Sequence, residues 1–455
     1  MKQYENIIIG FGKGGKTLAG ALAASGQSAA IIEQSDKMYG GTCINVACIP
    51  TKSLEHSARL SAAQGGSFEE KAIRYEKAIQ EKRRLTAMLR EKNYQKAVSG
   101  GVDVLLGKAR FQDKEHIVIT KPDGEEEILQ GKRFFINTGA RPFIPPIPGI
   151  EGNPFVYTSE TLMELDTLPE HLVIIGAGYI GLEFASYYAN FGTQVTILQD
   201  KGRFMPREDA EVADTVLASF ESRGIRLLPN ASATQITQAE NHAVVTVKTE
   251  SGIQELTAQA VLVATGRRPN IQELHPENAG IELTSRGAVL TDNYLRTTNP
   301  DIWAMGDVAG GLQFTYISLD DSRIVKSQLL GSKERTTENR GEVPYSVFLD
   351  PPFSRVGLTE QQALDQGYQI KIARLPAAAI PKAQVLKKTT GLLKVIVDAQ
   401  TNLILGAHLF CAESHEMIQL FKLAIDAKLP YTLLRDSIYT HPTMSESLND
   451  LLAGI

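Results

Sequence analysis

Apolar and polar positions in the first 35 residues predict a strand, a helix and a second strand. Residues 6–9, which include three consecutive isoleucines, are typical of a buried strand. Residues 16–25 are rich in alanine and leucine and predict a helix, and residues 29–32 predict the second strand. A helix between two buried strands indicates a parallel β-α-β unit.

A glycine loop joins the first predicted strand to the helix. Gly10, Gly12 and Gly15 stand in G-x-G-x-x-G register, and Glu33 follows the second strand, 23 residues after Gly10. Glycines at these positions let the backbone approach a pyrophosphate at the helix N-terminus. An acid about 20 residues further on accepts hydrogen bonds from ribose hydroxyls. Loop, helix, strand and acid together predict a dinucleotide-binding domain.

The same pattern returns in the middle of the chain. Gly176, Gly178 and Gly181 occupy the same register, and Gln199 stands where the acid would be, 23 residues after Gly176. The flanking strands are predicted at residues 172–175 and 194–198. Two such loops in one chain imply two bound nucleotides.

The remaining segments extend this organisation. Residues 53–99 predict helices with a charged, solvated face. Asp307 follows a short strand, which places it at the edge of a sheet where ligands bind. Four prolines between residues 142 and 148 predict a linker. Further strands are predicted at residues 102–120, 132–136, 346–349, 394–397 and 403–409.

Composition narrows the class of protein. The chain has 455 residues, 43% of them apolar and 22% charged, which is ordinary for a soluble protein of several domains. A formal net charge of −5 argues against a nucleic-acid-binding surface. No apolar run approaches the roughly 20 residues of a membrane helix, and the apolar start is too short for a signal peptide. We therefore expect a cytoplasmic protein without nucleic-acid or membrane partners.

Two of the three cysteines, Cys43 and Cys48, lie in one short stretch, residues 40–52. Residues five apart in a regular helix have Cα atoms roughly 8–9 Å apart, whereas a disulfide requires about 4.4–6.8 Å. If these cysteines pair, the backbone between them is therefore not a regular helix. Pro50 suits the first turn of a helix that begins near Cys48, and a helix N-terminus lowers the pKa of a thiol.

A redox-active pair is the favoured interpretation of Cys43 and Cys48. A zinc site needs about four ligands, and the sequence has no second cluster of cysteine and histidine to complete one. A structural disulfide fits poorly with a cytoplasmic chain that has an additional cysteine. That cysteine, Cys411, is expected in the packed core.

Of the eight histidines, His441 has the most suggestive setting. A single histidine is more often an ordinary surface or core residue. Here Pro442 restricts the local backbone, and Glu446 could orient the imidazole as a general base.

Together these motifs resemble the pyridine nucleotide–disulfide oxidoreductases over the full length of the chain. The likeness rests on both glycine loops, on residues 40–52, on Thr138-Gly139 and Gly306-Asp307, and on the segment from His441 to Glu446. It implies an α/β fold with two Rossmann-type dinucleotide-binding domains and an α+β C-terminal dimerisation domain. The implied boundaries are residues 1–148 and 270–340 for FAD, 149–269 for NAD(P), and 341–455 for dimerisation.

Within the family, the closest likeness is to the reactive-chlorine-resistance flavoenzymes, also described as hypothiocyanous acid reductases. Mercuric reductases come next, but their distinctive C-terminal cysteine pair has no counterpart in residues 451–455. Ala47 replaces a glycine found in many relatives. Residues 351–353, Pro-Pro-Phe, replace a more usual Pro-Glu, which the sequence does not explain.

The resemblance also implies roles for single residues. The positions that match FAD contacts are Gly10, Gly12, Gly15, Glu33, Gly41, Thr42, Lys52, Ala109, Thr138, Gly139, Asp307 and Thr315. Those that match contacts to the nicotinamide dinucleotide are Gly176, Gly178, Gly181, Gln199 and Gly266. Tyr179 matches the residue that gates the nicotinamide pocket, and Lys52 and Glu183 match an ion pair beside the reactive flavin ring.

The resemblance implies a chemistry for the thiol pair as well. Cys48 matches the thiol beside the flavin, and Cys43 matches the outer, interchange thiol. Hydride is expected to pass from nicotinamide to FAD, and electrons from there to the cysteines. His441, oriented by Glu446, matches a base contributed by the partner subunit, which implies a homodimer.

The expected function is that of an FAD-dependent NAD(P)H oxidoreductase that reduces a small electrophilic oxidant in defence against oxidative stress. Hypothiocyanous acid, reduced to thiocyanate, is the favoured substrate, and copper(II) and mercury(II) stay open. Dihydrolipoamide dehydrogenase, or another disulfide reductase, is the alternative. A non-catalytic flavin-binding subunit is disfavoured by the intact thiol pair.

The preferred nicotinamide cofactor is expected to be NADH. An acid at the end of the second strand favours NAD, and a nearby arginine favours NADP. Gln199 removes the charge of an acid without adding a cation, and Gly181 stands where NADP-dependent relatives often have alanine. We therefore expect NADPH to be usable but less effective.

Overall fold

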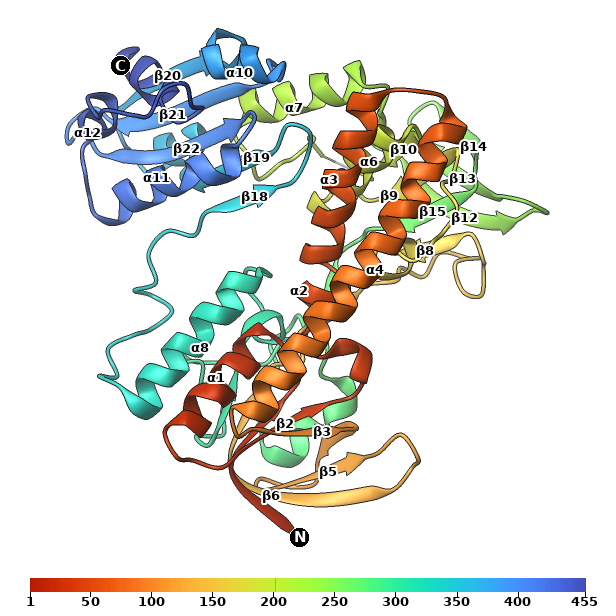
Figure 1. The fold of residues 1–455 in the computed structure, drawn as a ribbon, viewed down its shortest axis with the longest axis vertical. Helices are drawn as coiled ribbons and strands as arrows, with labels where there is room; N and C mark the ends of the chain where they lie inside the picture. Colours follow the sequence, from red (N-terminus) through yellow and green to blue (C-terminus); the bar gives the residue numbers. More distant parts are fainter. Residues whose placement is uncertain (201) are drawn as a thin grey trace. The chain divides into compact units, whose positions relative to one another are not determined.

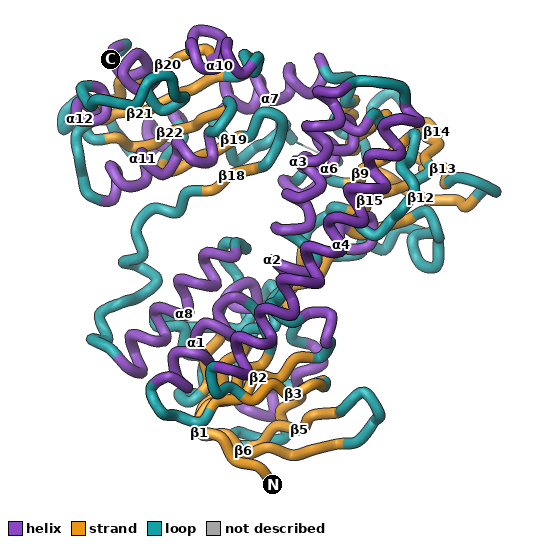
Figure 2. Tube along the Cα trace, in the orientation of Figure 1, coloured by secondary structure: helices purple, strands orange, loops and turns teal. Residues whose placement is uncertain are grey.

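The computed structural model describes residues 1–200 and 202–455, and these form two compact units (Figures 1 and 2). The first unit comprises residues 1–53, 77–143 and 266–340. The second comprises residues 54–76, 144–265 and 341–455. Helices α3 (Cys48–Gln64) and α4 (Phe68–Ser99) contribute residues to both units.

The first unit is built on a mixed sheet with strand order β3-β2-β1-β6-β5-β4, and β17 pairs with β6. The strands are β1 (Lys2–Ile9), β2 (Ala29–Glu33), β3 (Asp103–Leu106), β4 (Lys108–Phe111), β5 (His116–Thr120), β6 (Glu126–Ile136) and β17 (Ile302–Ala304). β3, β2, β1, β6 and β17 run parallel, and β4 and β5 extend the sheet antiparallel. Helices α1 (Lys13–Ala24) and α8 (Thr315–Leu330) pack together on this unit (Figure 1).

Alternation along β1 explains why three consecutive isoleucines are all buried. Ile7 and Ile9 belong to one core cluster, whereas Ile8 belongs to another, together with Phe11 and Leu18. Successive side chains of a strand point to opposite faces of the sheet. Burying each of these side chains contributes about 1.5–3 kcal/mol to folding, so β1 is a central element of the unit.

The second unit contains a fully parallel sheet with strand order β11-β10-β9-β15-β8. Its strands are β8 (Val156–Thr158), β9 (His171–Ile175), β10 (Gln194–Leu198), β11 (Arg226–Leu228) and β15 (Ala260–Val263). The associated helices are α5 (Ser159–Leu162), α6 (Tyr179–Phe191) and α7 (Ala210–Ser222). An antiparallel sheet follows, made of β12 (Ser232–Gln238), β13 (Ala243–Thr249) and β14 (Gly252–Ala258).

The C-terminal part of the second unit is an antiparallel sheet with strand order β18-β19-β22-β21-β20. Its strands are β18 (Tyr345–Val347), β19 (Phe353–Gly357), β20 (Ile370–Pro376), β21 (Leu392–Asp398) and β22 (Ile404–Phe410). Helices α11 (Ser414–Asp426) and α13 (Ser447–Ala453) pack against it, and α11 is labelled beside this sheet in Figure 2. The remaining short elements are α2 (Thr42–Asn45), β7 (Ala140–Pro142), β16 (Arg267–Pro269), α9 (Glu360–Asp365), α10 (Pro381–Leu386) and α12 (Tyr431–Arg435).

The predicted α/β class, with two Rossmann-type sheets and a C-terminal α+β part, is confirmed. The helix expected near Cys48 begins at that residue, and Pro50 lies in its first turn. The predicted domain boundaries at residues 148, 269 and 340 stay predictions. No helix among the described residues is long and apolar enough to cross a membrane.

Candidate active site

The first glycine loop lies between β1 and α1 and packs against the residue that follows β6. Gly10 has a φ of +98°, and a Cβ there would lie 2.5 Å from the carbonyl oxygen of Asn137. A Cβ on Gly15 would lie 2.8 Å from the carbonyl oxygen of Gly10. Gly41, from the stretch that carries the thiols, touches the same loop, because its Cβ would lie 2.6 Å from Cα of Gly12. These close approaches require glycine.

The buried Asn137 side chain, which no sequence motif had indicated, ties this loop to two other segments. Its Oδ1 accepts a hydrogen bond from the Gly15 N–H at 2.8 Å. Its Nδ2 donates to the Met305 carbonyl at 2.7 Å and to Ser318 Oγ at 3.2 Å. A Cβ on Gly12 would lie 2.5 Å from Asn137 Oδ1. The one sequence feature that could have indicated Asn137 is its position directly after a buried strand.

Two carboxylates at the ends of strands in the first unit are held away from bulk water. Glu33 is 8% exposed, and its two oxygens accept from the N–H groups of Phe11 and Ser35 at 3.0 and 3.3 Å. Burial raises the pKa of Glu33, against the effect of these hydrogen bonds. Burial likewise raises the pKa of Asp307, against the charge of Arg267. Glu33 is therefore placed where a ribose acceptor is expected.

FAD fits the first unit on these observations. The glycine loop allows close approach of a pyrophosphate, and Glu33 lies at the end of β2, where an acceptor for the ribose is expected. Gly139 leaves open space around its Cα. Gly139 has a φ of +70°, and among the described residues its Cβ would meet only Thr42 Oγ1, at 3.9 Å. Thr138 Oγ1 donates to the Asn270 carbonyl at 2.6 Å. Ala109, in β4, is half-buried.

The two thiols lie at the junction of two helices. Cys43 belongs to α2 and Cys48 begins α3, so the backbone between them is not one regular helix. The Cys48 sulfur lies 3.4 Å from Thr315 Oγ1. A hydrogen bond between the Cys43 and Cys48 thiols raises the pKa of Cys43, and burial raises it further. A hydrogen bond with Thr315 and the charge of Lys16 lower the pKa of Cys43.

Side chains of α4 and α1 brace the loop that carries the thiols. Asn45 Oδ1 accepts from Arg90 Nε at 2.9 Å. Lys16 Nζ donates to the Gly40 carbonyl at 3.2 Å and to Asn93 Oδ1 at 2.6 Å. Burial lowers the pKa of Lys16 to about 8. These residues were not indicated by a motif, since α4 approaches the loop only in the folded chain.

The second glycine loop, between β9 and α6, has a similar backbone but a more open surrounding. Gly176 has a φ of +111°, and its Cβ would lie 2.6 Å from the carbonyl oxygen of Ala264. A Cβ on Gly181 would overlap the carbonyl oxygen of Gly176. Around the Cβ position of Gly178, no atom of the described residues lies within 4 Å. The loop therefore leaves room for a pyrophosphate beside Gly178.

The side chains expected near the nicotinamide have partners within the second unit. Tyr179 begins α6, and its hydroxyl donates to the carboxylate of Glu208, a residue that no motif had indicated. Glu183 Oε1 accepts from the Phe348 N–H at 2.8 Å. Lys52 belongs to the first unit and Glu183 to the second, so the ion pair between them stays a prediction.

His441 and Glu446 are brought together. His441 Nδ1 lies 2.8 Å from Glu446 Oε2, and the two side chains are 74% and 18% exposed. A carboxylate in this position can orient an exposed imidazole for proton transfer. Cys411 is 0% exposed and belongs to the C-terminal core, and burial raises its pKa to about 12.

Two further predicted positions lie at the ends of strands. Gln199 follows β10, and its Nε2 donates to the Gly202 carbonyl at 2.7 Å. Gly266 follows β15 with a φ of +117°. In the part of the chain that the structure describes, no group of three histidine, cysteine, aspartate or glutamate side chains could hold a metal ion.

Two protein-family models match the chain. The model for the pyridine nucleotide-disulphide oxidoreductases matches residues 4–322, and the model for the dimerisation domain of the same proteins matches residues 343–452. Together the two models span nearly the whole chain. The resemblance inferred from the motifs is therefore confirmed.

Individual relatives agree with this result. The chain is 50% identical over 454 residues to the probable pyridine nucleotide-disulfide oxidoreductase RclA of Escherichia coli K12, covering 100% of this chain and 99% of RclA. It is 33% identical to a mercuric reductase of Staphylococcus aureus, covering 98% of this chain and 81% of that protein. A solved structure of the Cu(II) complex of the HOCl-induced flavoprotein disulfide reductase RclA from Escherichia coli has a TM-score of 0.94, at 49% identity, covering 100% of this chain and 99% of that one. The chain therefore belongs to the pyridine nucleotide-disulphide oxidoreductase family and is a flavoprotein disulfide-type reductase, a class that works with FAD and NAD(P)H.

Proposed function

We propose that this reductase uses NADH to remove a small electrophilic oxidant, hypothiocyanous acid above all, at the Cys43–Cys48 pair. The observation that carries the proposal is the setting of the pair. Both thiols are half-buried, hydrogen-bonded to each other, and flanked by the Thr315 hydroxyl and the Lys16 charge. A role in oxidative stress is supported by the relative that is described as HOCl-induced.

The thiol chemistry balances without an additional cysteine pair. The Cys43 thiolate attacks the sulfur of hypothiocyanous acid, an S–S bond forms, and hydroxide leaves and is protonated to water. The Cys48 thiolate then attacks the Cys43 sulfur, which closes the disulfide and releases thiocyanate. Two thiols and one hypothiocyanous acid thus yield a disulfide, thiocyanate, one proton and water, and the two electrons pass from the thiols to the oxidant.

FAD would be held by the first glycine loop, by Glu33 at the ribose and by the backbone around Gly139. Bound there, FAD would supply the transfer of two electrons between the nicotinamide and the disulfide. The contribution of this chain is to hold Cys48 at the start of α3 with its sulfur near Thr315. Lys16 stabilises negative charge on Cys43, because a cation favours the thiolate.

The working unit is proposed to be a cytoplasmic homodimer in which each subunit supplies a base to the other. A dimerisation domain, matched over residues 343–452, supports the association. The exposed His441 imidazole, oriented by Glu446, supports the role of the base. Light scattering should show a dimer, and an active monomer would refute this arrangement.

The test is a panel of oxidants with the purified FAD-loaded enzyme. Hypothiocyanous acid should drive rapid oxidation of NADH, whereas lipoamide and glutathione disulfide should have little effect. Cys43→Ser should retain FAD and its reduction by NADH but lose oxidant turnover. Cys411→Ala is the matched control, because Cys411 is buried in the C-terminal core, and its turnover should equal that of the wild type.

Two results of this panel would change the proposal. Full turnover by Cys43→Ser would refute the thiol mechanism. If lipoamide turned over as fast as hypothiocyanous acid, dihydrolipoamide dehydrogenase would be the better assignment. A dihydrolipoyl dehydrogenase of Mycobacterium tuberculosis is 31% identical over 468 residues, which keeps that alternative in the test.

Copper(II) reduction is a second candidate, because a solved structure of the 50% identical relative is a Cu(II) complex. Thiolates are soft ligands that suit copper in its reduced state. Copper-dependent NADH oxidation that is lost in Cys43→Ser and kept in Cys411→Ala would support it.

The preference for NADH is proposed on the basis of Gln199 and Gly181. kcat/KM should be higher for NADH than for NADPH, and Gln199→Glu should widen the difference by adding a charge that repels the 2′-phosphate. An advantage of tenfold or more for NADPH in the wild type would contradict the proposal.

A further inference from the structure

Tyr179 lies between the open glycine loop and a buried carboxylate. It follows Gly178 directly and is the first residue of α6. Its hydroxyl donates to Glu208, and the Tyr345 hydroxyl lies 3.4 Å away. The centroids of the two tyrosine rings are 5.8 Å apart. The phenol is therefore held at its polar end, although Tyr179 as a whole is only half-buried.

The Tyr179 hydroxyl is held by the carboxylate of Glu208. The Glu208 side chain is 0% exposed. It accepts from the Tyr345 hydroxyl at 2.8 Å and from Arg355 Nη1 at 3.3 Å. A buried carboxylate needs such partners, because an unpaired buried charge is strongly unfavourable. Tyr345 and Arg355 are directly opposite each other on β18 and β19, so both belong to the C-terminal sheet.

Arg355 is itself held from several sides. Its Nη2 donates to Gln362 Oε1 at 2.9 Å and to the Gly357 carbonyl at 3.1 Å. Its Nη1 also donates to the Arg207 carbonyl, next to Glu208 in the chain. The guanidinium therefore fixes both the carboxylate of Glu208 and the backbone that carries it.

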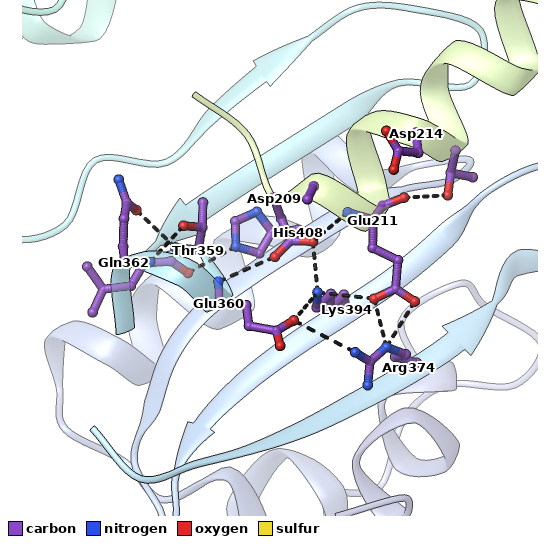
Figure 3. A network of polar contacts seen from close by, with 12 residues as sticks. Asp209, Glu211, Asp214, Thr359, Glu360, Gln362, Arg374, Lys394 and His408 are labelled. Carbon is purple, nitrogen blue, oxygen red and sulfur yellow. Dashed lines mark hydrogen bonds and ion pairs between the residues drawn. The ribbon is translucent and has the colours of Figure 1, made fainter. Parts of the chain in front are cut away.

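Asp209 anchors the same backbone through a second buried ion pair (Figure 3). Asp209 Oδ1 lies 2.8 Å from Lys394 Nζ, and both side chains are 2% exposed. Lys394 also pairs with Glu360 at 2.6 Å and with Glu211 at 3.1 Å. With neighbouring residues fixed to β19 and β21, Glu208 is not free to follow a moving tyrosine. Tyr179 has to leave Glu208 in order to move.

We propose that Glu208, held by Tyr345 and Arg355, is a positioning residue that latches Tyr179 closed, so that the C-terminal sheet sets how readily the nicotinamide dinucleotide binds. The inference rests on the gating role that the family resemblance implies for Tyr179 and on the proposed use of a nicotinamide dinucleotide. Binding that displaces the ring breaks the phenol–carboxylate hydrogen bond, and the affinity is reduced by the fraction of molecules in the open state. A hydrogen bond to a charged group is strong enough to change that fraction by about tenfold.

The experiment measures binding of NAD⁺ to the oxidised, FAD-loaded enzyme by calorimetry. Tyr179→Phe removes the donor, and Glu208→Gln keeps the shape of the side chain while weakening the acceptor. Each should tighten NAD⁺ binding by about tenfold, since Tyr179→Phe removes the hydrogen bond and Glu208→Gln removes the charge that strengthens it. Because both variants break the same bond, the double variant should bind no more tightly than either single variant.

Steady-state kinetics provide a second readout. KM for NADH should fall in both variants, in step with the tighter binding of NAD⁺. The matched control is Glu221→Gln, which removes the charge of an exposed glutamate on α7 and should leave NAD⁺ affinity unchanged. If Glu208→Gln does not fold, Tyr179→Phe tests the same hydrogen bond from its other end.

Unchanged or weaker NAD⁺ binding in Tyr179→Phe overturns the latch, as do additive effects in the double variant. This failure is distinct from failure of the proposed function. A wild-type enzyme that does not turn over hypothiocyanous acid refutes the substrate assignment, and the binding cycle still decides the latch.

Discussion

The two glycine loops have nearly the same backbone and very different neighbours. The Gly10 N–H donates to the Ile32 carbonyl at 2.8 Å, and the Gly176 N–H donates to the Leu198 carbonyl at 3.0 Å. The glycine before each helix is extended, with φ and ψ of −70° and 177° in the first loop and −76° and 171° in the second. Sequence register and backbone therefore agree between the loops.

The difference lies in the residue that follows the adjacent strand. In the first loop this residue is Asn137, whose amide binds Gly15, Met305 and Ser318. In the second loop it is Ala264, which has no polar side chain. The first loop is thus locked by buried hydrogen bonds, whereas the second loop is open at its middle glycine.

This contrast fits the tasks proposed for the two loops, the binding of FAD by the first and of the nicotinamide dinucleotide by the second. A resident cofactor benefits from a rigid site that keeps its shape through many turnovers, because preorganisation reduces the cost of binding. A co-substrate must enter and leave in each cycle, and a more open loop allows this. Experiments that make the loops more alike, or that remove one feature from each, test the comparison.

The largest effect is expected from alanine at the middle glycine of each loop. In Gly12→Ala the new Cβ meets Asn137 Oδ1, which cannot retreat, so the unfolding free energy should fall by about 1–3 kcal/mol and FAD should be lost. In Gly178→Ala the protein should keep its stability to within about 0.5 kcal/mol but lose NAD⁺ affinity. Thermal unfolding, flavin absorbance and calorimetry measure the three quantities. Equal losses of stability in Gly12→Ala and Gly178→Ala would show that the two loops are packed equally tightly around their middle glycines.

Asn137→Ala gives the first loop the residue type of the second. It leaves the buried Gly15 N–H and the Met305 carbonyl without their partner, and each unsatisfied group costs about 1–3 kcal/mol. We expect the unfolding free energy to fall by about 2–4 kcal/mol, measured by urea denaturation of the FAD-loaded enzyme. Ser318→Ala, which removes a weaker part of the same network, should cost about 1 kcal/mol. The comparison fails if the two variants are equally stable.

The smallest effect concerns Lys16, for which the second loop has Leu182. The Lys16 charge lowers the pKa of Cys43, so Lys16→Met should raise that pKa. Less thiolate is then present at pH 7, and reaction with the oxidant should slow by about three- to tenfold. The acid limb of its pH profile should move to higher pH. Lys13→Met is the control, because Lys13 lowers the pKa of Lys16 and its removal should not slow the reaction.

Lys16→Met should also change how the unfolding free energy depends on pH. The pKa of Lys16 is about 8 in the fold, below its ordinary value of 10.5. Between these two values the unfolded chain binds more protons than the folded chain, so this residue makes the wild type more stable as the pH rises through that window. Lys16→Met should flatten the rise. An unchanged pH dependence of the unfolding free energy would contradict the assigned pKa.

The fold and the outline of the site could be predicted from the sequence because they depend on local patterns. Three buried isoleucines before Gly10 identify a central strand, and the glycine spacing identifies the turn that follows it. The helix that begins at Cys48 was likewise predictable, since Pro50 has a preferred place in a first helical turn. Each of these inferences needs only neighbours in the chain.

The groups that tune the site were not predictable in the same way. Asn137 meets Ser318 across 181 residues of sequence, and Glu208 meets Arg355 across 147. Neither contact leaves a spacing rule, because the geometry comes from the packing of separate elements.

The sequence by itself determined the class of fold, the two glycine loops and the break in the helix between the two thiols, since strand alternation, glycine conformation and helix capping act over a few residues. Only the tertiary structure decided that the first loop is locked by Asn137 while the second is open, and that Tyr179 is held by Glu208, which pairs with Arg355 of the C-terminal sheet. Buried polar groups must find partners wherever the fold brings them, and those partners are set by packing rather than by order in the chain.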